Sequence, residues 1–165
     1  MASNNTLCIF MPNDNEPPAT NYATLDTRNG HPVLDFDQTT DESAIFSAVM
    51  PRSYGNSGVS VYLHVSATGI TTGSYIFDVA FERIGDGQQD VDSDGFATAQ
   101  SLAATAVPGT DGFVGIVSIP FTDGALMDGV TAGELFRLKV TRDADNLSDD
   151  AAADIELHAV EIRET

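Results

Sequence analysis

The sequence has little of several features that mark particular classes of protein. Cys8 is its single cysteine, so no disulfide can form within the chain, and tryptophan is absent. No apolar run approaches the roughly 20 residues that a membrane-spanning helix needs. The first residues lack the basic and apolar regions of a secretory signal, so we expect synthesis in the cytoplasm.

Basic residues are also scarce. Seven Lys and Arg face 25 Asp and Glu, which gives a formal net charge of −18, and Lys139 is the one lysine. A chain of this charge repels phosphate backbones and anionic lipid surfaces. The composition therefore argues against nucleic acids and membranes as partners.

The residues that are present suit one globular domain. The 165 residues are 42% hydrophobic, 8% aromatic and 19% charged, which is enough apolar material for a core. Short apolar or alternating runs follow one another, most of them separated by Gly, Asp, Asn, Pro and Ser, the residues typical of turns. These runs are Pro32–Phe36, Ser43–Met50, Val59–Ala67, Tyr75–Ile84, Phe96–Val107, Phe113–Phe121, Glu134–Arg142 and Ile155–Arg163.

Alternation of apolar and polar residues predicts strands rather than helices. In residues 59–66, valine or leucine stands at every odd position, and Ser60, Tyr62, His64 and Ser66 stand between them. A slip in phase between Leu157 and Val160 predicts a bulge. We therefore predict an all-β fold for residues 32–165, a two-sheet antiparallel sandwich of jelly-roll type, with an immunoglobulin-like sandwich as the alternative.

The first 31 residues carry no sustained period. Asn13–Asn21 is rich in Pro and Asn, and the run Thr6–Met11 before it is short and apolar. We interpret residues 1–31 as an extended N-terminal arm whose apolar segment pairs with the sheet edge of a neighbouring subunit. The alternative is that Thr6–Met11 forms a first strand of the protein's own sheet.

Aspartates at alternate positions predict an ion site. Asp90, Asp92 and Asp94 precede Gly95, as in the first half of a calcium loop. Ser101 stands where an EF-hand has its glutamate, so the hypothesis is a looser calcium loop between strands, and the alternative is a solvated acidic turn. A second acidic segment, residues 143–150, is interpreted as a solvated hairpin loop.

Motifs of catalysis are absent from the sequence. It contains no GxSxG elbow, no phosphate-binding glycine loop and no zinc-ligand spacing, and its three histidines are scattered along the chain. We therefore expect no enzyme, no catalytic residues and, calcium apart, no cofactor. Tyr22, Tyr54 and Tyr62 are candidates for a sugar-stacking surface. Six phenylalanines within the runs are expected in the core: Phe46, Phe77, Phe81, Phe113, Phe121 and Phe136.

Several segments resemble small virion structural proteins of tailed bacteriophages. They are Asn21–Asp37, Phe81–Ile84, Asp92–Gln100, Glu134–Asn146 and Ala159–Glu164. The resemblance implies a capsid decoration, or cement, protein on the outer surface of the virion head. Its expected partners are the major capsid protein and further copies of itself, with a homotrimer favoured over a homodimer. The alternatives are a tail- or fibre-associated virion module and a calcium-dependent carbohydrate-binding module.

Overall fold

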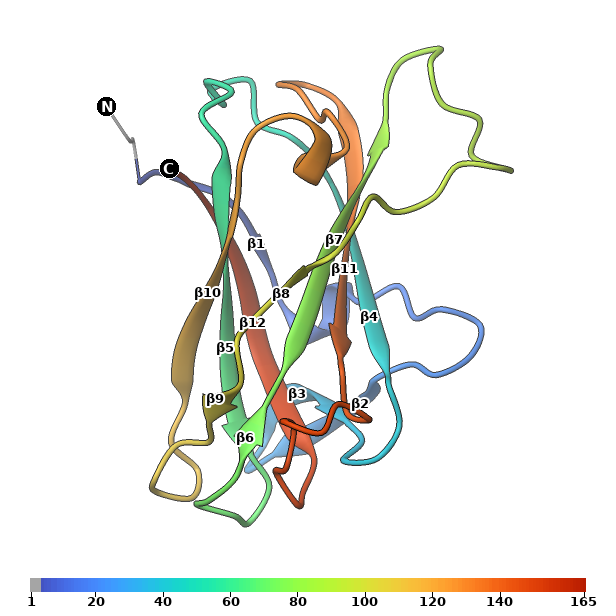
Figure 1. Ribbon diagram of the computed structural model, residues 1–165. Helices are drawn as coiled ribbons and strands as arrows, with labels where there is room; N and C mark the ends of the chain where they lie inside the picture. The colour runs from blue at the N-terminus through green and yellow to red at the C-terminus, as the bar shows by residue number, and fades with distance from the viewer. Residues whose placement is uncertain (1–3) are drawn as a thin grey trace.

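The computed structural model describes residues 4–165. Two antiparallel sheets pack face to face (Figure 1), which confirms the predicted sandwich. Sheet A has the strand order β10-β5-β12-β3-β2, and sheet B the order β4-β11-β7-β8. The strands of sheet A are β2 (Thr24–Arg28), β3 (His31–Phe36), β5 (Val59–Ala67), β10 (Gly115–Phe121) and β12 (Ile155–Glu164), with β1 (Thr6–Phe10) also paired to β12; those of sheet B are β4 (Ser43–Val49), β7 (Phe77–Ile84), β8 (Gln100–Ser101) and β11 (Leu135–Arg142).

Each predicted run contains at least one strand, but the run Phe96–Val107 does not form a continuous one. It contains only β8, which pairs with β7, and β9 (Thr105–Ala106), which pairs with β6 (Ser74–Tyr75) in a separate two-stranded sheet. Two short helices of the 3-10 type, Pro12–Asp14 and Ala125–Met127, complete the elements. Among residues 4–165, no helix has the length and apolar character to cross a membrane.

The alternating apolar and polar residues of the sequence point into the sandwich and toward its outer face, respectively. The valines and leucine of β5 are fully buried, while Ser60, Tyr62 and His64 are half-buried on the outer face. The register of β12 against β5 shifts between Leu157 and Ala159, which confirms the predicted bulge. His158 is the residue without a register partner on β5 at this shift, and its Nε2 atom lies 2.8 Å from the Ser66 oxygen of β5.

Phenylalanines from both sheets fill the space between them. Phe81 of sheet B meets Phe121 of sheet A edge-on, with ring centroids 5.0 Å apart, and Phe36 meets Phe77 at 5.1 Å. Such pairs stabilise the core beyond the area that they bury. Five of the six phenylalanines expected in the core are there. The exception is Phe113, which is 65% exposed because it lies in the loop before β10.

The N-terminal segment is part of the sandwich, so the expected boundary at residue 31 is wrong. Within this chain, β1 pairs with the C-terminal half of β12, and β2 forms a hairpin with β3. Phe10 of β1 is buried and stacks on Phe46 of sheet B, with ring centroids 5.2 Å apart. The alternative given for Thr6–Met11, a strand of the protein's own sheet, is the arrangement observed for residues 6–10. Residues 1–3 of the expected arm lie outside the described residues.

Candidate functional site

The outer face of sheet A carries a hollow of about 450 Å3 beside the β2–β3 hairpin. Its walls come from three distant parts of the chain: the turn of that hairpin, the loop before β10 and the bulge of β12. We call it the polar hollow; it is lined by Arg28, Asn29, His31, Gly112, Val114 and His158. No sequence motif links these residues, because strand pairing alone brings them together.

A hydrogen-bonded chain of four side chains forms the side of this hollow nearest the sheet. Arg28 forms an ion pair with Glu156, and the Ser66 hydroxyl lies 2.5 Å from the same Glu156 carboxylate oxygen. The Ser66 oxygen is also 2.8 Å from Nε2 of His158. Ser66 and Glu156 are buried, so this chain of contacts holds Arg28 and His158 in place at the wall of the hollow.

Arg28 has further partners besides Glu156. Besides Glu156, its guanidinium forms an ion pair with Asp111 at 2.6 Å and donates to the Ala67 carbonyl at 2.9 Å. The hydrogen bonds that Arg28 donates to Glu156 and Asp111 raise the pKa of Arg28 above its usual value. The one arginine that lines the hollow is therefore neutralised by two carboxylates.

All three histidines of the protein lie near one another here, although the sequence scatters them. His31 and His158 line the hollow, and His64 is close enough to act electrostatically on His158. Burial lowers the pKa of His158 below its ordinary value of 6.5; the charges of Arg28, His31 and His64 act in the same direction, and Glu156 opposes them. His158 is consequently neutral at pH 7.

A second carboxylate lies directly across the strand pair from Glu156. Asp35 on β3 is opposite Glu156 on β12, and its Oδ1 atom is buried without a hydrogen-bond partner. Burial, followed by repulsion from Glu156, raises the pKa of Asp35 to about 6. Two like charges at opposed positions destabilise a sheet, so the ionised form of Asp35 lowers the stability of the folded state.

The hollow has an apolar edge on the side of β10. Val114, which lines it, is exposed, and so are the neighbouring Phe113 and Ile116. Of the three tyrosines expected at the surface, Tyr22 is exposed and Tyr62 is half-buried beneath the Arg163 guanidinium, 4.1 Å from its ring centroid. Tyr54 is buried instead: its side chain belongs to the hydrophobic core, and its hydroxyl donates a hydrogen bond to Asp123.

The predicted calcium loop projects from one end of the sandwich, in the long connection between β7 and β8 (Figure 1). Asp90, Asp92 and Asp94 are all exposed there, and the Asp90 carboxylate accepts a hydrogen bond from the Asp92 amide. That contact is typical of a turn closed by its own aspartate. Calcium at these three residues stays a prediction.

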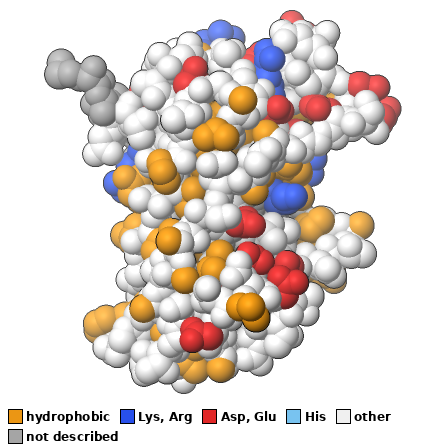
Figure 2. Space-filling model, in the orientation of Figure 1, with side chains coloured by type: hydrophobic (Ala, Val, Ile, Leu, Met, Phe, Trp, Pro, Cys, Tyr) orange, Lys and Arg blue, Asp and Glu red, His pale blue; other side chains and the backbone are white. Residues whose placement is uncertain are grey.

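A different trio of acids comes together elsewhere. Among residues 4–165, the group of three whose ligand atoms lie within 4.8 Å of one another is Asp41, Asp143 and Asp145. The charge of Asp41 is the main cause that raises the pKa of Asp145, so these carboxylates repel one another. Figure 2 shows acidic side chains at several separate places on the viewed face rather than in one patch.

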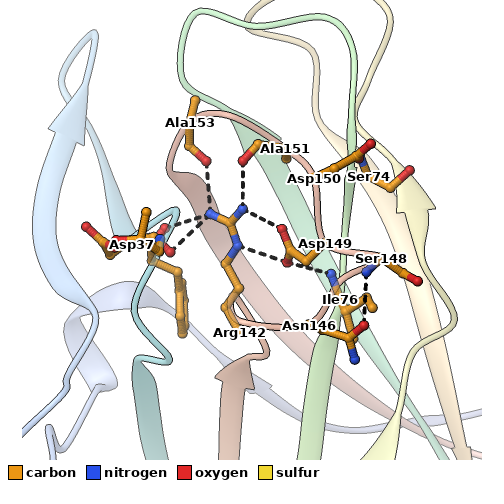
Figure 3. Close-up of polar contacts among 12 residues, drawn as sticks. Asp37, Ser74, Ile76, Arg142, Asn146, Ser148, Asp149, Asp150, Ala151 and Ala153 are labelled. Atoms are coloured by element: carbon orange, nitrogen blue, oxygen red, sulfur yellow. Dashed lines mark hydrogen bonds and ion pairs between the residues drawn. The ribbon is translucent and has the colours of Figure 1, made fainter.

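The second acidic segment is organised by a buried arginine (Figure 3). The side chains of Arg142 and Asp149 are both 0% exposed and form a two-point ion pair, at 2.8 and 3.1 Å. The guanidinium also donates to four backbone carbonyls, those of Phe36, Asp37, Ala151 and Ala153. The interpretation of residues 143–150 as a solvated loop is therefore wrong at Asp149, which anchors the loop inside the protein.

Comparison with known proteins finds similarity at the level of structure only. No family model matches the sequence, and no curated protein matches it. The CBM22-2 xylan-binding domain from Paenibacillus barcinonensis Xyn10C is similar over 92% of both chains, with 14% sequence identity and a TM-score of 0.51. The xylan-binding module CBM15 covers 96% of this chain and 97% of its own length, with 9% identity and a TM-score of 0.46. These likenesses concern the fold, which is a β-sandwich in each case.

Proposed function

We propose that this protein is a non-catalytic carbohydrate-binding module that binds a glycan in the polar hollow. The observation that carries the proposal is the chemistry of the lining, which combines an amide, two imidazoles and a guanidinium with an exposed apolar edge. A sugar presents hydroxyl groups along its rim and C–H groups on its faces, so it needs both kinds of partner. A hollow of about 450 Å3 is also within the size range of ligand sites.

The fold supports the same proposal at a coarser level. The Paenibacillus barcinonensis domain with the similar sandwich is described as xylan-binding. Sandwiches host many functions, so this likeness guides only the choice of the first ligand to test. Xylooligosaccharides are the natural starting point.

The composition of the lining also supports a role without catalysis. Glycoside hydrolysis uses two carboxyl groups that flank the bond to be cleaved. Of the described residues, those that line the polar hollow include no Asp or Glu. Glu156, the carboxylate hydrogen-bonded to Arg28 and Ser66, is buried.

Isothermal titration calorimetry with xylohexaose, cellohexaose and mannohexaose tests the proposal. We expect one of these glycans to bind and Asn29→Gly to weaken that binding about tenfold, the loss of one hydrogen bond. Asn56→Gly is the matched control, because Asn56 is also exposed and has a positive φ, 57° against 48° for Asn29. Glycine adopts this backbone region readily, so both variants keep the fold.

Two results would count against the proposal. The first is that none of the three glycans binds. The second is that Asn29→Gly and Asn56→Gly affect binding equally, which would place the ligand outside the polar hollow.

The virion role expected from the sequence resemblance stays a prediction, together with the major capsid protein as partner, the homotrimer and the outer capsid location. Neither of the similar structures reported above is a virion protein. Immunogold labelling of phage particles with antibody against the protein would test it: label on the heads supports capsid decoration, and bare particles contradict it. Dependence of glycan binding on calcium is likewise a prediction.

A further inference from the structure

The positions of the hydrogen atoms between Glu156, Ser66 and His158 follow from counting donors. A serine hydroxyl has one hydrogen to donate, and an ionised carboxylate has none. Glu156 forms an ion pair with Arg28, in which its carboxylate is the acceptor. The hydrogen between Ser66 and Glu156, 2.5 Å apart, therefore belongs to Ser66.

Because the Ser66 hydroxyl donates its hydrogen bond to Glu156, it can act only as an acceptor toward His158. Nε2 of His158 lies 2.8 Å from the Ser66 oxygen, so Nε2 carries the imidazole hydrogen. In a neutral imidazole the other nitrogen, Nδ1, is then an acceptor. The hydrogen bonds among Glu156, Ser66 and His158 thus select one of the two tautomers of His158, just as carboxylate partners orient histidines in other sites.

We infer that His158, held in its Nε2–H form by Ser66 and Glu156, is the specificity-determining acceptor of the polar hollow and receives a hydroxyl hydrogen from a neutral glycan through Nδ1. This inference rests on the proposed function. Ser66 and Glu156 are positioning residues, because neither lines the hollow and each acts on the ligand through a residue that does, His158 for Ser66 and both Arg28 and His158 for Glu156.

The charges around the hollow also favour a neutral ligand over an anionic one. Glu156 and Asp111 already neutralise Arg28, and together they outnumber its single charge. A glycan that carries carboxylates or sulfates would find no free cation there, in a chain whose net charge is −18. We therefore expect oligogalacturonates to bind far more weakly than uncharged oligosaccharides.

Protonation of His158 would remove the acceptor and place a charge beneath the ligand. The groups around it are Arg28, His31, His64 and Glu156, and their combined effect with burial already lowers the pKa of His158. A ligand that binds only the neutral form sees its apparent Kd rise toward tenfold for each pH unit below that pKa. Affinity should therefore be constant above about pH 7 and fall as the pH drops below the pKa of His158.

Two measurements test the inference on the full chain. Long-range proton–nitrogen NMR at pH 7.5 reports the tautomer of His158 directly and needs no ligand. Calorimetry between pH 7.5 and pH 5, with the neutral hexaose that binds, reports the pH profile of affinity. In His158→Gln, the amide supplies an N–H to Ser66 and a carbonyl acceptor but does not titrate, so we expect weaker binding whose affinity no longer changes with pH.

Asp35 and His64 supply the controls, because the pKa of Asp35 is raised to about 6, the charge of His64 acts on His158, and neither residue lines the hollow. Asp35→Asn and His64→Gln should each keep the fall in affinity at low pH. A profile abolished by either control and kept in His158→Gln would overturn the assignment to His158, and so would an Nδ1–H signal from His158. Absence of glycan binding beside an Nε2–H signal would instead overturn the proposed function and, with it, the ligand named here.

Discussion

The buried side chain of Arg142 leads to a quantitative prediction about the stability of the protein. Its guanidinium is completely buried and donates to the Asp149 carboxylate and to backbone carbonyls of two segments, the end of β3 and the loop before β12 (Figure 3). Replacement by methionine keeps most of the volume and removes every one of these hydrogen bonds. Asp149 would then retain only the Ile76 amide as a hydrogen-bond donor among its described contacts.

The expected cost follows from what is left behind. A buried ion pair that loses one partner costs about 3–5 kcal/mol, because the remaining charge is buried without compensation. For a domain of this length, each kcal/mol corresponds to about 2–4 °C in Tm. Arg142→Met should therefore lower Tm by about 6–20 °C.

Thermal and urea unfolding followed by far-UV circular dichroism measure this effect, since the chain has no tryptophan to report on folding. Arg163→Met is the matched control: Arg163 pairs with Glu161 at the surface and is 31% exposed, and such pairs contribute about 0–1 kcal/mol. If Arg142→Met costs no more than Arg163→Met, the reasoning from burial is refuted. The double variant Arg142→Met with Asp149→Leu should recover part of the loss, because no unpaired charge remains.

Three further predictions concern other parts of the sandwich. The folded state binds a proton at Asp35 more tightly than the unfolded chain, so the stability that this group contributes is lost as the pH rises from about 4 to about 6. Asp35→Asn should therefore raise the free energy of unfolding at pH 7 by about 1–3 kcal/mol, and an equal gain at pH 4 would contradict this. Phe10→Ala should lower the free energy of unfolding in urea by about 3–5 kcal/mol, whereas Ile9→Ala, at the exposed neighbouring position, should lower it by less than about 1 kcal/mol. Equal small losses in the two variants would show that β1 is not part of the core. Burial raises the pKa of the Cys8 thiol to about 11, so at pH 8 it should react with a disulfide reagent at least about 100-fold more slowly in the native protein than in urea, and equal rates would be the adverse result.

The strands and their inward faces were predictable because they depend on local alternation. Runs such as Val59–Ala67 and the phase slip near Leu157 appear in the structure at the expected positions. Prediction failed where a residue's surroundings come from elsewhere in the chain. Phe113 has strand-like neighbours yet lies in an exposed loop, and Tyr54 lies in a turn yet fills the core.

The same distinction applies to the N-terminus and to Arg142. Nothing local tells whether an apolar strand pairs with its own sheet or with a neighbour's, and β1 pairs with β12, at the opposite end of the chain. Whether an ion pair is exposed or buried depends on the loops that cover it. For Arg142 and Asp149 those loops include the chain after β3, which supplies the Asp37 carbonyl.

The polar hollow shows the division between sequence and tertiary structure most clearly. By itself, the sequence determined the polar outer positions of β5, including His64 and Ser66, because period-two alternation is a local property of a strand. Only the tertiary structure brought His31 and His158 beside them, by pairing β12 with β5 on one side and β3 on the other. Such contacts join residues far apart in the chain, and their energy depends on the packing of whole sheets rather than on any local pattern.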